Sequence, residues 1–197
     1  MKKLLITGFE PFGGEVINPS WEAVLRLPEE IGGYRLTKLL VPVVFGEAGK
    51  TVIEAAQSDA PDVVLCIGQA GGRSAVTPEL VGINLRHGSI PDNAGAKPED
   101  EPIIEGGAAA YFSTLPVRRM AKAVNDAGVA SHLSYSAGAY VCNDLLYTLL
   151  AHFEGSKTRV GFIHIPYSKE QNREPSMELC NMVRGLTAAI ENIDDGI

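Results

Sequence analysis

The sequence has few cysteines, no excess of basic residues and no long apolar run, and each shortage excludes a class of protein. Its three cysteines, Cys66, Cys142 and Cys180, cannot all pair, so we expect free thiols in a reducing cytoplasm rather than a disulfide framework. With 17 Lys and Arg against 24 Asp and Glu, the net charge of -7 argues against nucleic acid as the main partner. No apolar stretch reaches the roughly 20 residues of a membrane-spanning helix, so no membrane contact is expected.

The chain also lacks internal repeats, low-complexity segments and linkers between domains. Its 197 residues are enough to bury one sizeable core. The hydrophobic content of 45% and the charged content of 21% are those of an ordinary folded protein. We therefore expect a single domain that spans residues 1–197.

Apolar segments typical of β-strands alternate with helical patterns along the whole sequence. The strand-like segments are KLLITG, YRLTKLLVPV, PDVVLCIG, LVGINL, SHLSYSAG and RVGFIHIP, and the expected helices cover residues 19–27, 45–58, 116–127, 140–154 and 175–192. Apolar strands between helices indicate a single α/β domain, in which a mostly parallel twisted sheet is sandwiched between helices. In such a sheet, functional side chains gather beyond the carboxyl ends of the strands.

The first strand leads into a glycine-rich loop, GFEPFGG, that contains no Lys or Arg. A glycine loop between a first strand and a helix is where α/β proteins often hold phosphate, so a nucleotide- or phosphate-binding module is one interpretation. The loop matches neither the G-x-G-x-x-G motif nor the G-x-x-x-x-G-K-[ST] motif, which counts against that interpretation. Phe9 and Phe12 favour a flat, uncharged ring as the ligand instead.

The segment SAGAYVCNDLLYTLLAHF supplies a candidate nucleophile. Cys142 falls in the first turn of the helix expected at 140–154, where the positive end of the helix dipole favours a thiolate. Backbone N–H groups at the same helix start could form an oxyanion hole. A lone cysteine among apolar residues is more often a small buried side chain, so these residues alone leave both roles open.

A nucleophilic thiol needs a base, and His164 is the histidine best placed to supply one. It lies near the carboxyl end of the strand RVGFIHIP, at the edge where helix 140–154 begins if the sheet is parallel. Glu79, beyond the strand VVLCIG, is a candidate for orienting the imidazole ring. A hydrogen-bonded core histidine and a capping or surface carboxylate are the alternative interpretations. Spacing alone gives only weak support to a thiol enzyme.

Five ordered motifs resemble those of the pyroglutamyl-peptidase I family, also called pyrrolidone-carboxylate peptidases, which are cytoplasmic cysteine peptidases. The motifs are TGFEPFGG with NPSWEAV, GQAGGR with TPE, INL with IPDN, AGAYVCNDLLY, and GFIHIPYSKEQ. The resemblance implies a triad of Cys142, His164 and Glu79 that removes the N-terminal residue of pyroglutamylated peptides through a thioester. It also implies an α/β sheet between helices, a homotetramer, and chemistry without a metal or an organic cofactor.

The resemblance further implies a pocket for the pyroglutamyl ring. Its positions in this chain are Phe9, Phe12, Gln69, Ile90, Tyr140 and Val141. Two positions depart from the family pattern: Ser89 stands before IPDN, and Leu80 follows Glu79, where relatives commonly have arginine. The missing charge at Ser89 leaves open a noncatalytic relative with a decayed site. Arg73 and Arg86 are the candidates to supply that charge.

Overall fold

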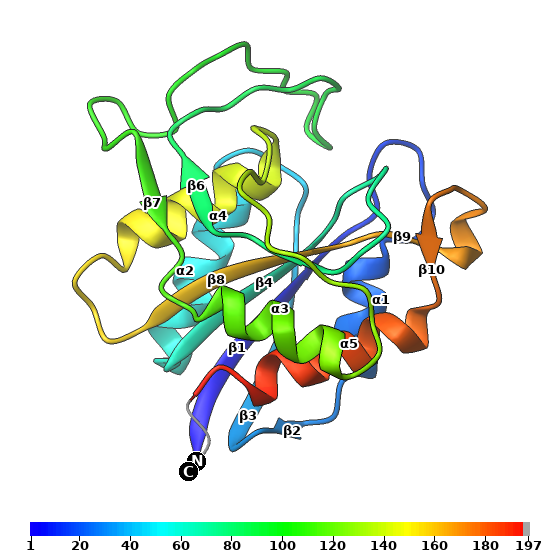
Figure 1. Cartoon of the computed structure of the whole chain (residues 1–197). Coiled ribbons are helices and arrows are strands. Elements are labelled where there is room, and N and C mark those ends of the chain that lie inside the picture. The colour runs from blue at the N-terminus through cyan, green and yellow to red at the C-terminus, as the bar shows by residue number, and fades with distance from the viewer. Residues whose placement is uncertain (195–197) are drawn as a thin grey trace.

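A six-stranded sheet in the order β2-β3-β1-β4-β8-β5 forms the centre of the computed structural model, which describes residues 1–194 (Figure 1). The four central strands run parallel: β3 (Tyr34–Val41), β1 (Lys2–Phe9), β4 (Val63–Gln69) and β8 (Arg159–Ile165). Two short edge strands, β2 (Glu30–Ile31) and β5 (Thr77–Pro78), pair antiparallel with their neighbours. The predicted mostly parallel sheet is confirmed.

Successive residues of the central strands enter two separate cores, one on each face of the sheet. Leu4 and Ile6 of β1 pack into one core, whereas Leu5 packs into the other. In β4, Leu65 belongs to the first core and Cys66 to the second. Because both faces are covered, these strands are apolar along almost their whole length.

Helices cover both faces of the sheet, as the sequence predicted (Figure 1). One face is covered by α1 (Pro19–Arg26), α3 (Val117–Asp126) and α5 (Leu179–Glu191), and the other by α2 (Glu47–Asp59) and α4 (Val141–His152). The predicted ranges of the first four helices along the chain are confirmed to within two residues. Within residues 1–194, no helix is long and apolar enough to cross a lipid bilayer.

The predicted start of the last helix is wrong. α5 begins at Leu179 rather than at Pro175. The residues between them form β10 (Ser176–Met177), which pairs in parallel with β9 (Tyr167–Ser168). Pairing with the short strand β9 therefore holds this segment extended, although its sequence favours a helix start.

The segment SHLSYSAG, residues 131–138, is not the strand that its sequence predicted. It pairs only through isolated bridges, at Ser131 and Ser134. Local hydrogen bonds occupy the rest of the segment: Ser134 Oγ donates to Ser136 O, and Ser136 Oγ accepts from the N–H of Gly138. Short serine side chains that bond to nearby backbone in this way compete with strand pairing.

Outside the main sheet, a two-stranded ribbon flanks α4 (Figure 1). The segment LVGINL supplies its first strand, β6 (Val81–Ile83), which pairs antiparallel with β7 (Ala110–Phe112). The chain between these strands, residues 84–109, contains no helix or strand and extends beyond the start of α4. It carries Ser89 and Ile90 to the carboxyl edge of the sheet.

Candidate active site

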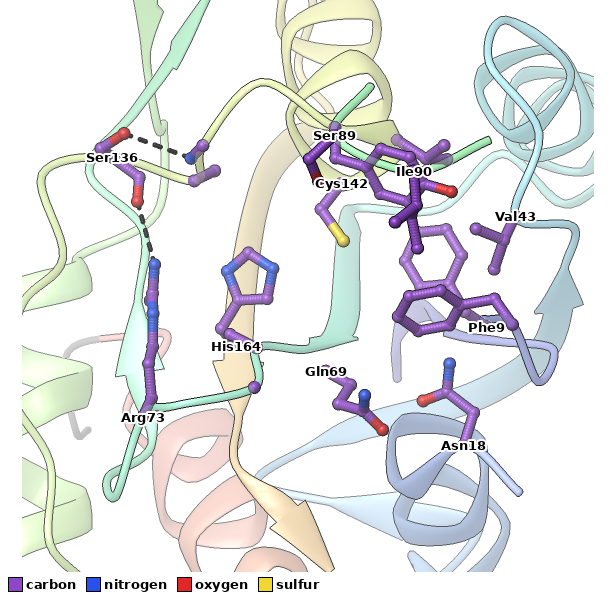
Figure 2. A pocket seen from close by; sticks show the side chains of 17 residues that line it. Phe9, Asn18, Val43, Gln69, Arg73, Ser89, Ile90, Ser136, Cys142 and His164 are labelled. Atoms are coloured by element: carbon purple, nitrogen blue, oxygen red, sulfur yellow. Dashed lines mark hydrogen bonds between the residues drawn. The ribbon is translucent and has the colours of Figure 1, made fainter. Parts of the chain in front are cut away.

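A cavity of about 480 Å³ lies at the carboxyl edge of the parallel strands (Figure 2). It brings together segments from β1, β4, β8, the start of α4 and the long connection between β6 and β7. The predicted site residues that line it are Phe9, Phe12, Gln69, Ile90, Tyr140, Val141, Cys142 and His164. Glu79, the remaining predicted residue, does not line the cavity and lies behind His164.

Cys142 is the second residue of α4, close to the sheet. A Cβ added to Gly68 in β4 would lie 3.1 Å from Cys142 Sγ and 2.7 Å from the Phe162 ring, so only glycine allows this close approach. Gly68 is the register partner of His164 in β8. The thiol therefore lies over the strand pair that carries the imidazole, and Figure 2 shows its sulfur directed into the cavity beside the His164 ring.

His164 and Glu79 form a buried pair. Nδ1 of His164 lies 2.7 Å from Oε1 of Glu79, and the two side chains are 3% and 0% exposed. Next to β8, the N–H of Glu79 donates to Phe162 O at 2.9 Å. A carboxylate can only accept, so Nδ1 carries the imidazole proton and Nε2 is left for the thiol. Glu79 is neither a surface carboxylate nor a helix cap.

Arg73 is a second partner of Glu79 that the sequence did not predict. Its Nη1 lies 2.7 Å from the same Oε1 of Glu79 and 2.6 Å from Thr77 Oγ1. Its Nη2 donates to Ser136 O at 3.0 Å, a bond drawn in Figure 2. Arg73 therefore connects the buried carboxylate to the segment that leads into α4.

Burial sets the direction of the pKa shifts of Cys142 and His164, but not of that of Glu79. Burial, and then the charge of Glu79, raises the pKa of the Cys142 thiol to about 12. Burial lowers the pKa of His164, although the bond to Glu79 acts in the opposite direction. Burial opposes the charged form of Glu79, yet its bond to His164 and the charge of Arg73 hold its pKa below the usual value.

At neutral pH the resting site therefore contains a neutral thiol, a neutral imidazole and a carboxylate. The position of Cys142 at a helix start predicted a favoured thiolate. Burial acts in the opposite direction and has the largest effect on the pKa of this thiol. A neutral thiol can act as a nucleophile only if its proton leaves during the attack.

The start of α4 supplies hydrogen-bond donors beside the thiol. The N–H groups of Asn143 and Asp144 donate to Tyr140 O at 3.0 and 3.1 Å. Within residues 1–194, those of Val141 and Cys142 donate to no backbone carbonyl, and the N–H of Cys142 acts on its own thiol to lower the pKa. Unpaired N–H groups at a helix start can stabilise a developing oxyanion.

Aromatic side chains form the wall of the cavity opposite His164. The ring of Tyr140 lies 6.2 Å from that of Phe12 and 5.2 Å from that of Phe45, measured between centroids. The Tyr140 hydroxyl donates to Pro91 O at 3.0 Å, which holds the long connection against α4. Phe9 is 2% exposed and forms part of the core beneath the cavity.

Asn18 and Val43 also line the cavity, and the sequence analysis missed both as site residues. Asn18 also caps α1, where its side chain accepts from the N–H of Ser20 at 3.1 Å. Both residues follow the carboxyl ends of central strands, so the rule that placed Cys142 and His164 would have found them.

The two arginines proposed to replace the charge missing at Ser89 have different positions. Ser89 and Arg73 line the cavity, but Arg73 is already bonded to Glu79. Arg86 lies outside the cavity lining, and its Nε donates to Asp144 Oδ1 at 2.7 Å. Neither arginine places an unpaired positive charge in the cavity.

Comparison with known proteins agrees with this geometry. A family profile described as pyroglutamyl peptidase matches residues 2–195. The chain belongs to the pyroglutamyl peptidase family.

Members of this family from distant organisms are similar along almost their full length. A pyrrolidone-carboxylate peptidase of Levilactobacillus brevis is 53% identical over 197 residues, 97% of each chain. One from Thermococcus kodakarensis is 47% identical over 196 residues, 97% of this chain and 95% of that one. The crystal structure of Bacillus amyloliquefaciens pyroglutamyl peptidase I superposes with a TM-score of 0.94 at 43% identity, over 98% of this chain and 97% of that one.

Membership in the pyroglutamyl peptidase family confirms the resemblance inferred from the five motifs. It does not favour the interpretation of GFEPFGG as a phosphate loop. Among the described residues that line the cavity, Arg73 alone is cationic, and its charge is paired with Glu79.

Proposed function

We propose that the chain removes the N-terminal pyroglutamyl residue from peptides, with Cys142 as nucleophile, His164 as general base and acid, and Glu79 as the group that orients the imidazole. The observation that carries the proposal is the 2.7 Å bond between His164 Nδ1 and Glu79 Oε1, next to a thiol in the same cavity. Base, orienting carboxylate and thiol are the parts that acyl transfer to sulfur requires.

The lining of the cavity suits a neutral five-membered lactam. Phe9, Phe12 and Tyr140 supply apolar surface, and Gln69 supplies a polar group at one side. An ordinary peptide N-terminus carries an ammonium group, which would lose its hydration here without gaining a partner charge. The pocket would thus select pyroglutamyl peptides partly by excluding charged N-termini.

The reaction begins with a neutral pair. As Cys142 Sγ attacks the pyroglutamyl carbonyl carbon, its proton moves to His164 Nε2, and the N–H groups of Val141 and Cys142 stabilise the oxyanion. Glu79 stabilises the imidazolium that forms. His164 then gives the proton to the leaving amine, and the C–N bond breaks to leave a thioester on Sγ. Water, deprotonated by His164, attacks the thioester, and the thiol leaves with its proton.

The test is turnover of a chromogenic pyroglutamyl anilide by the wild type, Cys142→Ser and Cys180→Ser. We expect kcat for Cys142→Ser to fall by roughly 10³-fold or more, because a serine hydroxyl is a far weaker nucleophile beside a neutral imidazole. Cys180 is exposed and free, so Cys180→Ser should match the wild type. Substantial turnover by Cys142→Ser would overturn the nucleophile, and an inactive wild type would favour a noncatalytic relative.

We also propose that the chain acts in the cytoplasm as a homotetramer, in keeping with the family resemblance. The free thiols of Cys66, Cys142 and Cys180 support a reducing compartment. Light scattering coupled to gel filtration will measure the assembly. A mass equal to one chain at micromolar concentration would contradict the tetramer.

A further inference from the structure

A short chain of amide hydrogen bonds leads from the backbone into the cavity. Gln171 lies at the end of a single 3₁₀ turn, η1 (Lys169–Gln171), directly after β9. Its Oε1 accepts from the N–H of Ser168 at 3.0 Å, and its Nε2 donates to Gln69 Oε1 at 2.9 Å. The second of these bonds joins residues that are 102 positions apart in the chain.

The bond from the N–H of Ser168 to Gln171 determines the orientation of both glutamine amides. A backbone N–H can only donate, so the Gln171 atom that faces Ser168 must be the oxygen. The Gln171 nitrogen then faces Gln69, and a nitrogen that donates requires an oxygen opposite it. Gln69 therefore turns its oxygen to Gln171 and its own nitrogen to the other side.

That other side is the interior of the cavity. Gln69 is the last residue of β4 and lines the cavity, and Figure 2 shows its amide nitrogen turned toward Phe9 and Cys142 and its oxygen turned away. Within residues 1–194, Gln69 Nε2 donates no hydrogen bond. The cavity thus presents an N–H donor that awaits an acceptor.

The other amide in the lining does not offer the same freedom. Asn18 Oδ1 accepts from both the N–H and the hydroxyl of Ser20, and Asn18 Nδ2 donates to Glu10 O at 2.9 Å. Gln69 is therefore the side-chain amide whose orientation can decide which ring enters. A ring with a carbonyl oxygen satisfies the donor, whereas a ring with N–H groups at that place meets another donor.

We propose that Gln171 is a positioning residue that fixes the amide of Gln69, so that the cavity selects rings with a carbonyl oxygen over rings with a donor at the same place. The inference rests on the proposed function, because the ring in question is the pyroglutamyl lactam. Under this proposal Gln171, which lies outside the cavity lining, determines whether the cavity prefers a ring with an acceptor or a ring with a donor.

The variant Gln171→Glu tests the proposal by reversing the direction of the hydrogen bond between residue 171 and Gln69. The new carboxylate still accepts from the N–H of Ser168, so the 3₁₀ turn keeps its bond. It cannot donate to Gln69 Oε1, so the Gln69 amide turns over to donate to the carboxylate and presents its oxygen to the cavity. Asn172→Asp is the matched control, because it adds the same charge at an exposed neighbouring residue with a left-handed φ of 53° that aspartate tolerates.

Two probes of similar ring shape read out the orientation by competitive inhibition of pyroglutamyl anilide turnover. They are neutral 2-pyrrolidinone, with a carbonyl oxygen, and 2-iminopyrrolidine, which is protonated at neutral pH and has N–H groups at the same place. The uncharged variant Gln171→Leu separates the effect of orientation from attraction between the cationic probe and the new carboxylate. We expect Gln171→Glu to raise KM by roughly 10- to 100-fold and to reverse the preference from the lactam toward the amidine. Asn172→Asp should keep the wild-type KM and preference, which separates orientation from added charge.

Gln171→Leu provides a second test if Gln171→Glu folds poorly by circular dichroism. It leaves the Gln69 amide free to take both orientations, so we expect the preference for the lactam to shrink roughly tenfold or less without reversing. An unchanged preference in folded variants, or a fall in kcat alone, would overturn the inference. A wild type that hydrolyses no pyroglutamyl anilide would instead overturn the proposed function.

Discussion

Two buried carboxylates, each paired with an arginine, have very different surroundings. Asp144 in α4 accepts from Arg86 on Oδ1 and from the N–H of Gly46 on Oδ2 at 2.8 Å, so both of its oxygens are bonded. Glu79 accepts from both Arg73 and His164 on Oε1 alone. Its Oε2 is buried and forms no hydrogen bond of normal geometry within residues 1–194. Ser134 is near enough to help lower the pKa of Glu79, but its hydroxyl donates to Ser136 O.

This is the difference expected between a structural ion pair and the functional pair that we propose. Both carboxylates are 0% exposed, so burial alone does not distinguish them. Asp144 joins α4 to the start of α2, and each of its carboxylate oxygens accepts a hydrogen bond. Glu79 accepts from two donors on one oxygen atom, beside an imidazole that gains and loses a proton in the proposed reaction. Incomplete pairing of this kind is characteristic of sites that change their charge during function.

The largest expected effect comes from neutralising each carboxylate in turn. Glu79→Gln should lower kcat by roughly 10³-fold, because the imidazolium formed during attack loses its stabilising charge. Asp144→Asn should keep kcat within a few-fold and lower the free energy of unfolding by about 1–3 kcal/mol. Steady-state kinetics and urea unfolding measure the two quantities. Equal losses of kcat in both variants would remove the distinction between the pairs.

The carboxylates themselves show how far the sequence could predict the site. The rule that functional side chains gather at the carboxyl edge of parallel strands made His164 and Glu79 candidates beside Cys142, because it depends only on strand order and direction. The five family motifs then selected these three residues as the predicted triad. The contact of Arg73 with Glu79 was not predictable, since it depends on a turn and on side-chain rotamers. The same holds for the bond between Gln171 and Gln69, which joins residues far apart in the chain.

For the fold, as for the site, the features with a local sequence signal were predictable, and those that depend on tertiary contacts were not. The central strands and the first four helices have local apolar patterns that agree with their tertiary positions. The two failures are segments whose partners decide their conformation: residues 175–178 before α5, and residues 131–138 before α4. Likewise, the helix dipole at Cys142 was visible in the sequence, but the burial that outweighs it depends on the packed cavity.

Replacing Arg73 or Arg86 should have a smaller effect, and the two variants should differ in the quantity that changes. Arg73 should affect the pH dependence of kcat/KM, and Arg86 should affect Tm. Arg73 lowers the pKa of His164, although burial has the larger influence. In Arg73→Met the pKa of His164 should therefore rise, and the acid limb of kcat/KM should move to higher pH, with a fall of roughly tenfold at neutral pH.

Arg86→Met is the control for this shift. Arg86 lies outside the cavity lining, so its loss should lower Tm and leave the acid limb unchanged. A pH–rate profile for each variant makes the comparison. Profiles that coincide with the wild type in both variants would show that Arg73 is only a structural partner of Glu79.

The smallest expected effect concerns stability against pH. The pKa of His164 is lowered by burial, so between the folded value and the ordinary value of 6.5 the unfolded chain binds more protons than the folded chain. The free energy of unfolding should therefore fall as pH drops below 6.5. The pKa of Glu79 is also lowered, despite the opposing effect of burial, so its contribution is lost only at still lower pH, below its usual 4.5.

His164→Gln removes the first of these contributions. Its unfolding free energy should vary less between pH 7 and pH 5 than that of the wild type, as urea unfolding at each pH can measure. His87, which is bonded to Asp100 on the surface, provides the matched variant His87→Gln. A slope for His164→Gln that equals the wild-type slope would contradict a neutral, buried His164.

The most direct test of the account is to find the acyl group during turnover. Wild-type protein that is mixed with excess pyroglutamyl anilide, quenched in acid within milliseconds to seconds and digested can be mapped by mass spectrometry. We predict one pyroglutamyl group, bound as a thioester to the peptide that contains Cys142 and absent in Cys142→Ser. Rapid turnover with the acyl group on another residue would contradict the central claim that Cys142 attacks the substrate.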